Sequence, residues 1–290
     1  MTSARSRCHL SRAALAAALA VQAVVLAAQS SPREQAPLDV TGYWVSIVTE
    51  DWHERMVTPR HGDYASLPLN DAGKRAADAW DPAKATPGDA CKPFGAAAIM
   101  RVPGRVHLTW ESPSALKIET DAGLQTRRLV FDGSVPGRWR TNARGELVWE
   151  EGRSPVRAAA RPRDWQGQSV ARWDIAPDPA AVRTSLFFPG GVGTGPDGAG
   201  LVAPGRFGSL HVETTGFRAG YLRRNGVPYS DQARVTEDYD FRIEDDGTQW
   251  FTVTTVVDDP TYLAAPFVTS TDFRKEKDGS KWRPLACAEY

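Results

Sequence analysis

The sequence predicts a mainly β protein: an antiparallel β-barrel or a strongly curved sheet of the lipocalin-like type, with one short helix. The first observation behind this prediction is a series of short segments in which apolar and polar residues alternate, as in strands that bury one face. The second is the turn chemistry between them, with Asn-Gly at 225–226 and Asp-Gly at 246–247. The third is the content of ten Trp, ten Phe and seven Tyr, which suits a barrel lined or plugged by rings.

The N-terminal residues 1–28 are predicted to be a secretory signal peptide. Arg5, Arg7 and Arg12 precede an apolar run over 13–28, and small residues follow it. The run is too short and wrongly flanked for a membrane span, so we expect a secreted or periplasmic protein without stable membrane insertion. After a disordered polar tail at 29–38, we expect a single domain over 39–290.

The charge balance argues against a nucleic-acid partner. The chain carries 35 basic and 35 acidic residues, so no overall field would attract a polyanion. Neither composition nor charge indicates an oligomeric state.

Two cysteines of the mature chain, Cys91 and Cys287, are expected to form a disulfide. Cys8 would leave with the signal peptide, and an even pair in an oxidising compartment is typical of a bridge. The bridge would tie the C-terminal tail to the first third of the chain, which contributes on the order of 5 kcal/mol as an upper value. The alternative, a thiol nucleophile, has no supporting motif at either position.

The first elements follow from local composition. Residues 40–48 are β-branched and aromatic and predict the first strand. A dense polar stretch over 50–64 comes next. Residues 72–80 predict the helix, which Asn70 or Asp71 can cap and which Asp81-Pro82 ends.

Residues 99–131 change to a period of two and predict a β-meander of strands 106–110, 116–120 and 125–131. Pairing Trp110 with Leu116 across the first turn would set His107 opposite Glu119 on a polar face. The opposite face would be apolar, and it consists of Val106, Leu108, Trp110, Leu116 and Ile118.

The remaining chain predicts further strands and two insertions. Residues 134–167 are rich in Arg and read as an exposed insertion, and the Gly-rich segment 189–208 reads as a mobile loop. The other predicted strands are 169–175, 209–215, 234–244, 250–258 and 269–274, which brings the expected total to about nine or ten.

The polar stretch after the first strand is the first candidate site. Its side chains could bind a metal, with His53 and His61 as weak candidates, or supply a general base oriented by a carboxylate. The spacing fits no known metal motif, and a polar loop that satisfies its own backbone is the other interpretation. The ligand-binding residues expected around this stretch are Trp44, Trp52, Arg55, Tyr64 and Trp110.

Two strand faces are further candidates. His107 beside Glu119 forms an acid/base pair if that face lines a barrel, and an ordinary cross-strand pair if it faces solvent. A third set of polar and aromatic residues lies later in the chain, and we expect it to be a solvated strand face. This set consists of His211, Glu213, Tyr229, Glu237 and Tyr239.

Four segments carry motifs that occur together in one order. They are Trp110-Glu111 with 116–127, then 210–217, Val235-Thr236-Glu237 and 257–260. In these motifs the chain resembles a family of uncharacterised secreted bacterial β-rich proteins, over most of residues 40–282 apart from the two insertions. The resemblance implies an exported β-rich domain and supplies no catalytic residue. The lipocalin-like barrel is an analogy of fold alone.

The function expected from the sequence is binding of a small, partly apolar molecule in a β-barrel pocket. The alternative is a lyase, isomerase or hydrolase without a cofactor, with His53 or His107 as base and a carboxylate of Glu50, Asp51 or Glu119 to orient it. A structural or surface-interaction protein is the third possibility. No cofactor is expected in any of them.

Overall fold

The computed structural model describes residues 31–131, 138–142, 144–150, 162–175 and 208–288. The predicted signal peptide lies outside the described residues, and so does the Gly-rich segment 189–208 apart from its last residue. Of the Arg-rich insertion, the described parts include a hairpin of β6 (Arg138–Thr141) and β7 (Leu147–Glu150).

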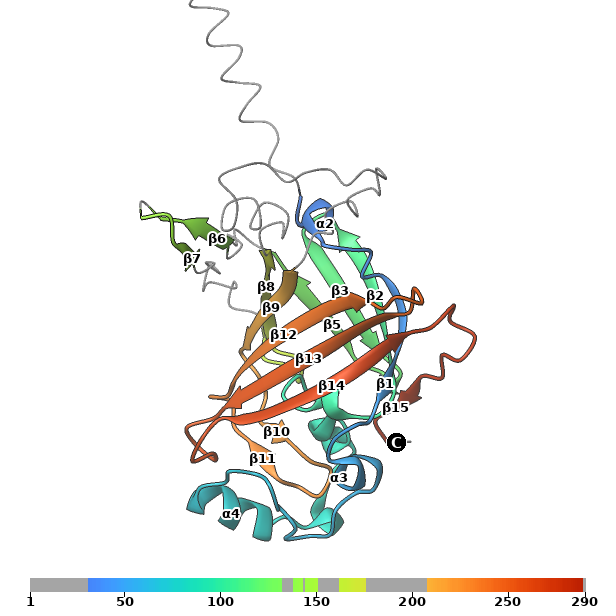
Figure 1. The fold of residues 1–290 in the computed structure, drawn as a ribbon. Helices are drawn as coiled ribbons and strands as arrows, with labels where there is room; N and C mark the ends of the chain where they lie inside the picture. The colour runs from blue at the N-terminus through green and yellow to red at the C-terminus, as the bar shows by residue number, and fades with distance from the viewer. Residues whose placement is uncertain (1–30, 132–137, 143, 151–161, 176–207, 289–290) are drawn as a thin grey trace, which may run out of the picture.

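Nine strands form a closed barrel, which confirms the predicted fold class (Figure 1). In sheet order they are β5 (Thr126–Val130), β3 (Ala115–Thr120), β2 (Arg105–Ser112), β1 (Gly42–Ile47), β14 (Phe267–Lys275), β13 (Gln249–Asp258), β12 (Arg234–Ile243), β9 (Gly208–Thr215) and β8 (Gln168–Ile175). Neighbours in this order pair antiparallel, and a short parallel pairing of β8 with β5 closes the ring. Closure leaves these strands without a free edge.

Short elements cover the ends of the barrel. The predicted helix is α4 (Asp71–Asp78), whose N-cap Asn70 accepts a hydrogen bond from Gly73 N at 2.9 Å. Two further helices have only four or five residues, too few to give a periodic signal. The remaining elements are α2 (Pro32–Gln35), α3 (Trp52–Met56), η1 (Pro82–Lys84), η2 (Pro87–Asp89), η3 (Lys92–Phe94), η4 (Ile99–Arg101), β4 (Ala122–Gly123), β10 (Gly220–Tyr221), β11 (Pro228–Tyr229) and β15 (Leu285–Ala286).

The meander has the predicted register. His107 lies opposite Glu119, and Trp110 lies opposite Leu116. The alternation holds because a strand that buries one face must place every second residue inside. The apolar face packs into the barrel, with Trp110 half-buried at its rim and the other four residues buried.

The barrel interior is filled by side chains. Large rings from β1, β8, β12, β13 and β14 contact one another there, and Phe251 stacks on Phe273 with ring centroids 4.6 Å apart. The fully buried rings of this cluster on the strands are Trp44, Trp173, Tyr239, Phe251 and Phe273. The interior is therefore a packed core, and a ligand pocket has to be sought at an end of the barrel.

A polar layer divides this core from a second hydrophobic cluster. Along β12 the buried residues are Val235, Glu237 and Tyr239, and the two outer ones belong to different clusters. Glu237 forms a bidentate ion pair with Arg127 of β5, at 3.0 Å between Nη1 and Oε1 and closer between Nη2 and Oε2. Burial alone would lower the pKa of Arg127, but Glu237 raises it above its ordinary value.

Hydroxyl groups complete the hydrogen bonds of this layer. Arg127 donates from Nε to Ser169 Oγ at 3.1 Å and from Nη2 to Thr214 Oγ1 at 2.7 Å. Tyr239 donates from its hydroxyl to Glu237 Oε1 at 3.3 Å. The buried pair is thus well supplied with partners, as a buried charge must be to be tolerated.

The N-terminal segment 31–38 closes one end of the barrel, in contrast to the disordered tail predicted for 29–38. Ser31 and Glu34 form a capping box at α2, and Trp173 Nε1 donates to Pro32 O at 2.7 Å. Ala36 and Leu38 pack against the core. The sequence gives no sign of this because the segment acquires its order from the barrel end beneath it.

The opposite end carries α3, α4 and the hairpin of β10 and β11 (Figure 1). Asn225, in the hairpin turn, donates from Nδ2 to the carbonyl oxygens of Arg60 at 2.9 Å and Asp63 at 2.7 Å. The turn thereby fixes the polar stretch that follows the first strand.

The turn residue Gly226 cannot carry a side chain. Its φ is +84°, and a Cβ there would lie 2.1 Å from Trp80 Cγ. We expect Gly226→Ala to lower the free energy of unfolding by about 2–3 kcal/mol, through backbone strain and overpacking. Gly247→Ala is the matched control, because Gly247 has φ +82° and no atom within 4 Å of the added Cβ. Equal losses for the two variants in urea denaturation would contradict the packing argument.

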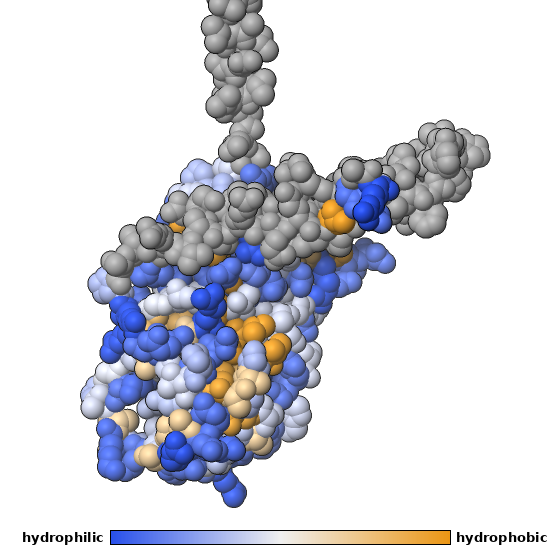
Figure 2. Space-filling view, turned by 90° about the vertical axis from the view of Figure 1, so that its left-hand side faces the viewer, coloured by the Kyte–Doolittle hydropathy of each residue, from blue (hydrophilic) through white to orange (hydrophobic). Residues whose placement is uncertain are grey.

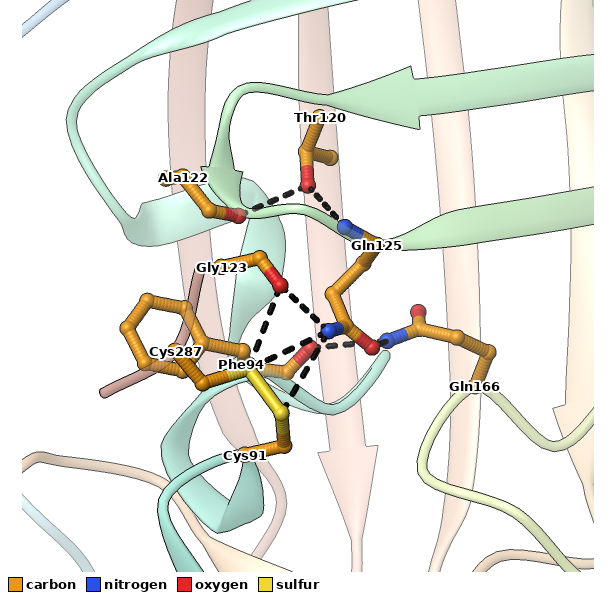
Figure 3. Close-up of a disulfide and its surroundings, with 8 residues drawn as sticks. All are labelled: Cys91, Phe94, Thr120, Ala122, Gly123, Gln125, Gln166 and Cys287. Carbon is orange, nitrogen blue, oxygen red and sulfur yellow. Dashed lines mark hydrogen bonds between the residues drawn. A yellow bond between two sulfur atoms is a disulfide. The ribbon is translucent and has the colours of Figure 1, made fainter. Parts of the chain in front are cut away.

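The disulfide between Cys91 and Cys287 forms as predicted and joins the C-terminal tail to this end (Figure 3). β15, just before Cys287, pairs in parallel with β4. Gln125 Nε2 donates to Gly123 O at 2.6 Å and lies 3.3 Å from Cys287 Sγ. The bridge is adjacent to η3, so it fixes the segment that leads into the pocket described below.

The face of the molecule drawn in Figure 2 is mainly hydrophilic, with one strip of hydrophobic residues. Among the described residues, no helix has the length and hydropathy needed to cross a membrane.

Candidate functional site

A pocket opens at the barrel end where α3 lies near η4 and the β10–β11 turn. Its empty volume, open solvent included, is about 460 Å³. About half of its lining is apolar, from residues that include Val57, Ala98, Val102 and Leu222. The charged lining residues are Arg55, Arg101, Arg223, Arg224 and Glu54.

Arg101 is the structural centre of the charged wall. It lies in η4, is buried, and donates from Nη2 to Asp51 Oδ2 at 3.0 Å. Its guanidinium also lies 5.3 Å from the ring centroid of Phe267. Its carbonyl oxygen accepts a hydrogen bond from Arg55 Nε at 2.9 Å, which joins α3 to η4. Asp51 takes a left-handed conformation with φ +48° at the start of α3.

Arg55 and Arg223 present buried nitrogen atoms without a partner. Within the described part of the chain, Arg55 Nη1 and Nη2 and Arg223 Nε and Nη1 have no hydrogen-bond acceptor. Arg223 is only 4% exposed, and Nη2 is its one satisfied group, donating to Ser66 Oγ at 3.1 Å. Buried guanidinium groups are ordinarily paired, so these two are costly in the ligand-free protein.

Arg101 is also repelled by the positive charges of Arg223 and Arg55. Burial lowers the pKa of Arg101 to about 10, with a further contribution from the positive charge of Arg223. Burial likewise lowers the pKa of Arg55 and of Arg223 below the ordinary value. The pocket therefore combines an apolar wall with a group of closely spaced positive charges.

The side chains of the polar stretch that was predicted as a metal or acid/base site do not come together in one site. Glu50 Oε1 accepts hydrogen bonds from Ser270 N and Oγ, both at 2.7 Å, and so anchors the loop to β14. His53 is exposed on α3, and His61 Nε2 lies 3.1 Å from Ala77 O. The described residues contain no group of three potential metal ligands from His, Cys, Asp and Glu. Of the site residues predicted in this stretch, Arg55 lines the pocket.

The aromatic residues predicted to bind a ligand also lie in different parts of the structure. Trp44 is fully buried in the barrel, where its Nε1 donates to Val40 O at 3.1 Å, whereas Trp52 is 64% exposed on α3. Trp110 lies near the opposite end of the barrel and contacts Phe131. Tyr64 packs against the second hydrophobic cluster. The first strand continues into the core, which is why Trp44 cannot face the polar loop.

The predicted pair of His107 and Glu119 forms on the outer face of the barrel. His107 Nδ1 lies 3.3 Å from Glu119 Oε2, and Lys117 Nζ lies 3.0 Å from the same oxygen. Tyr43 stacks on His107 with ring centroids 4.0 Å apart. The histidine is thus a member of a partly exposed cross-strand cluster.

The third set of polar strand residues divides between the two faces. His211 and Glu213 lie outside as predicted, and His211 Nδ1 is 2.7 Å from Asp238 Oδ1. The solvated-face prediction is wrong for the other three residues, which are fully buried. These are Tyr229, Glu237 and Tyr239.

Sequence reasoning missed Arg101 and Arg223, the two most buried arginines of the pocket. A signal was present for Arg101, because it interrupts the apolar run 96–102 and a charge within such a run needs a partner or a function. Arg223 precedes the Asn225-Gly226 turn, and nothing in the local pattern separates it from an ordinary turn residue.

Comparison of the chain with protein-family models, with curated proteins and with solved structures gave no match.

Proposed function

We propose that the protein is an exported binder of a small, partly apolar molecule, and that its binding site is the pocket at the α3 end of the barrel. The observation that carries the proposal is the combination of an apolar wall with unpartnered, buried hydrogen-bond donors in one concavity. Ligand sites typically combine apolar lining with polar groups that fix the orientation of the ligand, and this pocket has both, with an unusually large polar share. The disulfide agrees with an oxidising compartment.

The packed interior favours this pocket over the barrel lumen expected from the sequence. A lipocalin-type ligand would have to displace Trp44, Trp173 and Phe251, which are in mutual contact with the core. The pocket at the end of the barrel is already open, so a ligand can enter it without such a rearrangement.

The test is calorimetric titration of the purified chain with a panel of small aromatic and aliphatic compounds, some neutral and some charged. We expect at least one class of compound to bind with a Kd below 1 mM, and Val57→Trp to weaken its binding at least tenfold by filling the mouth of the pocket. Val57 is 55% exposed, so the larger side chain should not disturb folding.

Ile243→Trp is the matched control, because Ile243 is 56% exposed and ends β12 on the far side of the polar layer. It should leave the Kd unchanged. Absence of binding by the whole panel, or an equal loss in both variants, would contradict the proposal.

A further inference from the structure

The arginines of the pocket differ in how closely carboxylates approach them. Asp51 pairs directly with Arg101, whereas Glu50 and Asp272 attract Arg55, and Glu54 and Asp63 attract Arg223, only through longer-range electrostatics. Within the described part of the chain, Arg101 forms an ion pair, whereas Arg55 and Arg223 do not. The charges that lack a direct counter-ion are therefore located on two particular side chains.

The positions of the unpartnered nitrogen atoms indicate which chemical group could accept their hydrogen bonds. Arg223 offers Nε and Nη1, which point to different edges of its guanidinium and donate separately, whereas Arg55 offers Nη1 and Nη2, the paired end of a planar fork. Such a fork matches the oxygen pair of a carboxylate or phosphate, to which it donates two parallel hydrogen bonds. A neutral ligand would leave the positive charge buried and unpaired.

Both guanidinium groups are held in place before any ligand arrives. Arg55 is fixed by its Nε hydrogen bond to Arg101 O, and Arg223 by its Nη2 hydrogen bond to Ser66 Oγ. The Arg223 segment is fixed in turn by the contacts of Asn225 with the backbone of Arg60 and Asp63. A preorganised site loses less conformational entropy on binding.

We propose that the ligand carries an oxyanion group, a carboxylate or a phosphate, which Arg55 and Arg223 bind through charge-assisted hydrogen bonds while its apolar part rests on Val57, Ala98 and Leu222. The inference rests on the proposed function and gives the chemical class of its ligand. A phosphate monoester, with a charge of about −1.5 to −2 at pH 7, is the more highly charged of these two groups.

The first experiment compares ligands that share one ring and differ in the polar group. Phenyl phosphate, benzoate and benzyl alcohol are titrated into the purified chain at constant ionic strength, with inorganic phosphate as the anion alone. We expect at least one of the two ring-bearing anions to bind about 10- to 100-fold more tightly than benzyl alcohol, the range of a hydrogen bond to a charged group. The order of the affinities for phenyl phosphate and benzoate identifies the preferred anionic group. Binding of inorganic phosphate alone would indicate a free anion as the ligand.

Two other outcomes separate this inference from the proposed function. Benzyl alcohol binding as tightly as both anions would overturn the oxyanion inference and leave the pocket as a site for apolar molecules. No binding by any of the four, with none from the wider panel, would overturn both.

The second experiment replaces the guanidinium. Arg223→Met should weaken anion binding at least tenfold and leave benzyl alcohol unaffected. It should also raise the Tm of the ligand-free protein by about 2–4 °C, because an apolar side chain removes an unpaired buried charge. Arg223→Lys keeps the charge but loses the planar guanidinium with its two free donors, so its affinity should be intermediate. Arg55→Met should give the same affinity loss if Arg223→Met does not fold.

Arg242→Met is the control for net charge, since Arg242 lies on the outer face of β12 and pairs with Glu244 at 2.9 Å. This variant should change neither the affinities for the four ligands nor the order of those affinities. A lower Tm in Arg223→Met together with unchanged anion affinity would make Arg223 a purely structural residue and would overturn the inference.

Discussion

Replacing Glu237 by Met is expected to lower the free energy of unfolding by about 3–5 kcal/mol, the cost of leaving one partner of a buried ion pair alone. Glu237 is fully buried, and its partner Arg127 is 4% exposed, so solvent cannot reach the charge that remains. The hydroxyls of Ser169 and Thr214 would still accept from Arg127, but they carry no charge to offset it. Urea denaturation followed by circular dichroism measures the loss.

A double-mutant cycle separates the pair from its surroundings. Arg127→Met should cost a similar amount, whereas the double variant Arg127→Met/Glu237→Met should lose much less than the two single losses together. The residual loss should come from the hydroxyl of Tyr239, which donates to Glu237, and adding Tyr239→Phe should recover part of it. Additive single losses would show that the two charges do not stabilise each other.

The alternation of residues was enough to predict the strands and their pairing in the meander. It fixed His107 opposite Glu119 because a shift of one residue would have turned the apolar face outward. The same alternation also contained the polar layer: Glu237 shares a face with Val235 and Tyr239, and Arg127 shares one with Leu129. The charges of Glu237 and Arg127 suggested exposed side chains, but both residues are buried because they lie on the inward face of their strands.

The pocket could not be assembled from the sequence. Its arginines come from α3, η4 and the β10–β11 turn, and only the three-dimensional fold brings these segments together. Local pattern located Arg55 because it lies in a dense polar stretch. It could not show that Arg223, far along the chain, lies beside Arg101. The residue types of His53 and His61 suggested a metal site, yet His53 is exposed on α3 and His61 contacts the carbonyl oxygen of Ala77.

The segment 31–38 shows the same limit for the barrel end. Its polar composition and short length predict disorder, and α2 would be unstable as an isolated helix of four residues. Order comes from the rim of the barrel, where Trp173 holds Pro32. Tertiary contacts of this kind leave no periodic trace in the sequence.

Removing the disulfide by Cys91→Ala/Cys287→Ala is expected to lower the free energy of unfolding by about 2–5 kcal/mol. The bridge joins residues separated by 196 positions, so the unfolded chain gains much freedom when it is lost. The native state gains some freedom too, because β15 is short, Leu285 is exposed, and the tail after β14 can separate from β4 while the barrel remains closed. This second gain keeps the net loss below the full chain-entropy value.

Two measurements distinguish these contributions. Urea denaturation gives the global loss, and hydrogen exchange at Leu285 N, which donates to Asp121 O at 2.9 Å, reports separation of the tail. We expect both to change, with the amides of β13 keeping their order of protection. Since η3 follows Cys91 directly and contributes Pro93 to the pocket, ligand affinity should also fall in the variant. A global loss under about 1 kcal/mol with unaltered exchange at Leu285 would mean that the tail is held by its own contacts and that the bridge adds little to them.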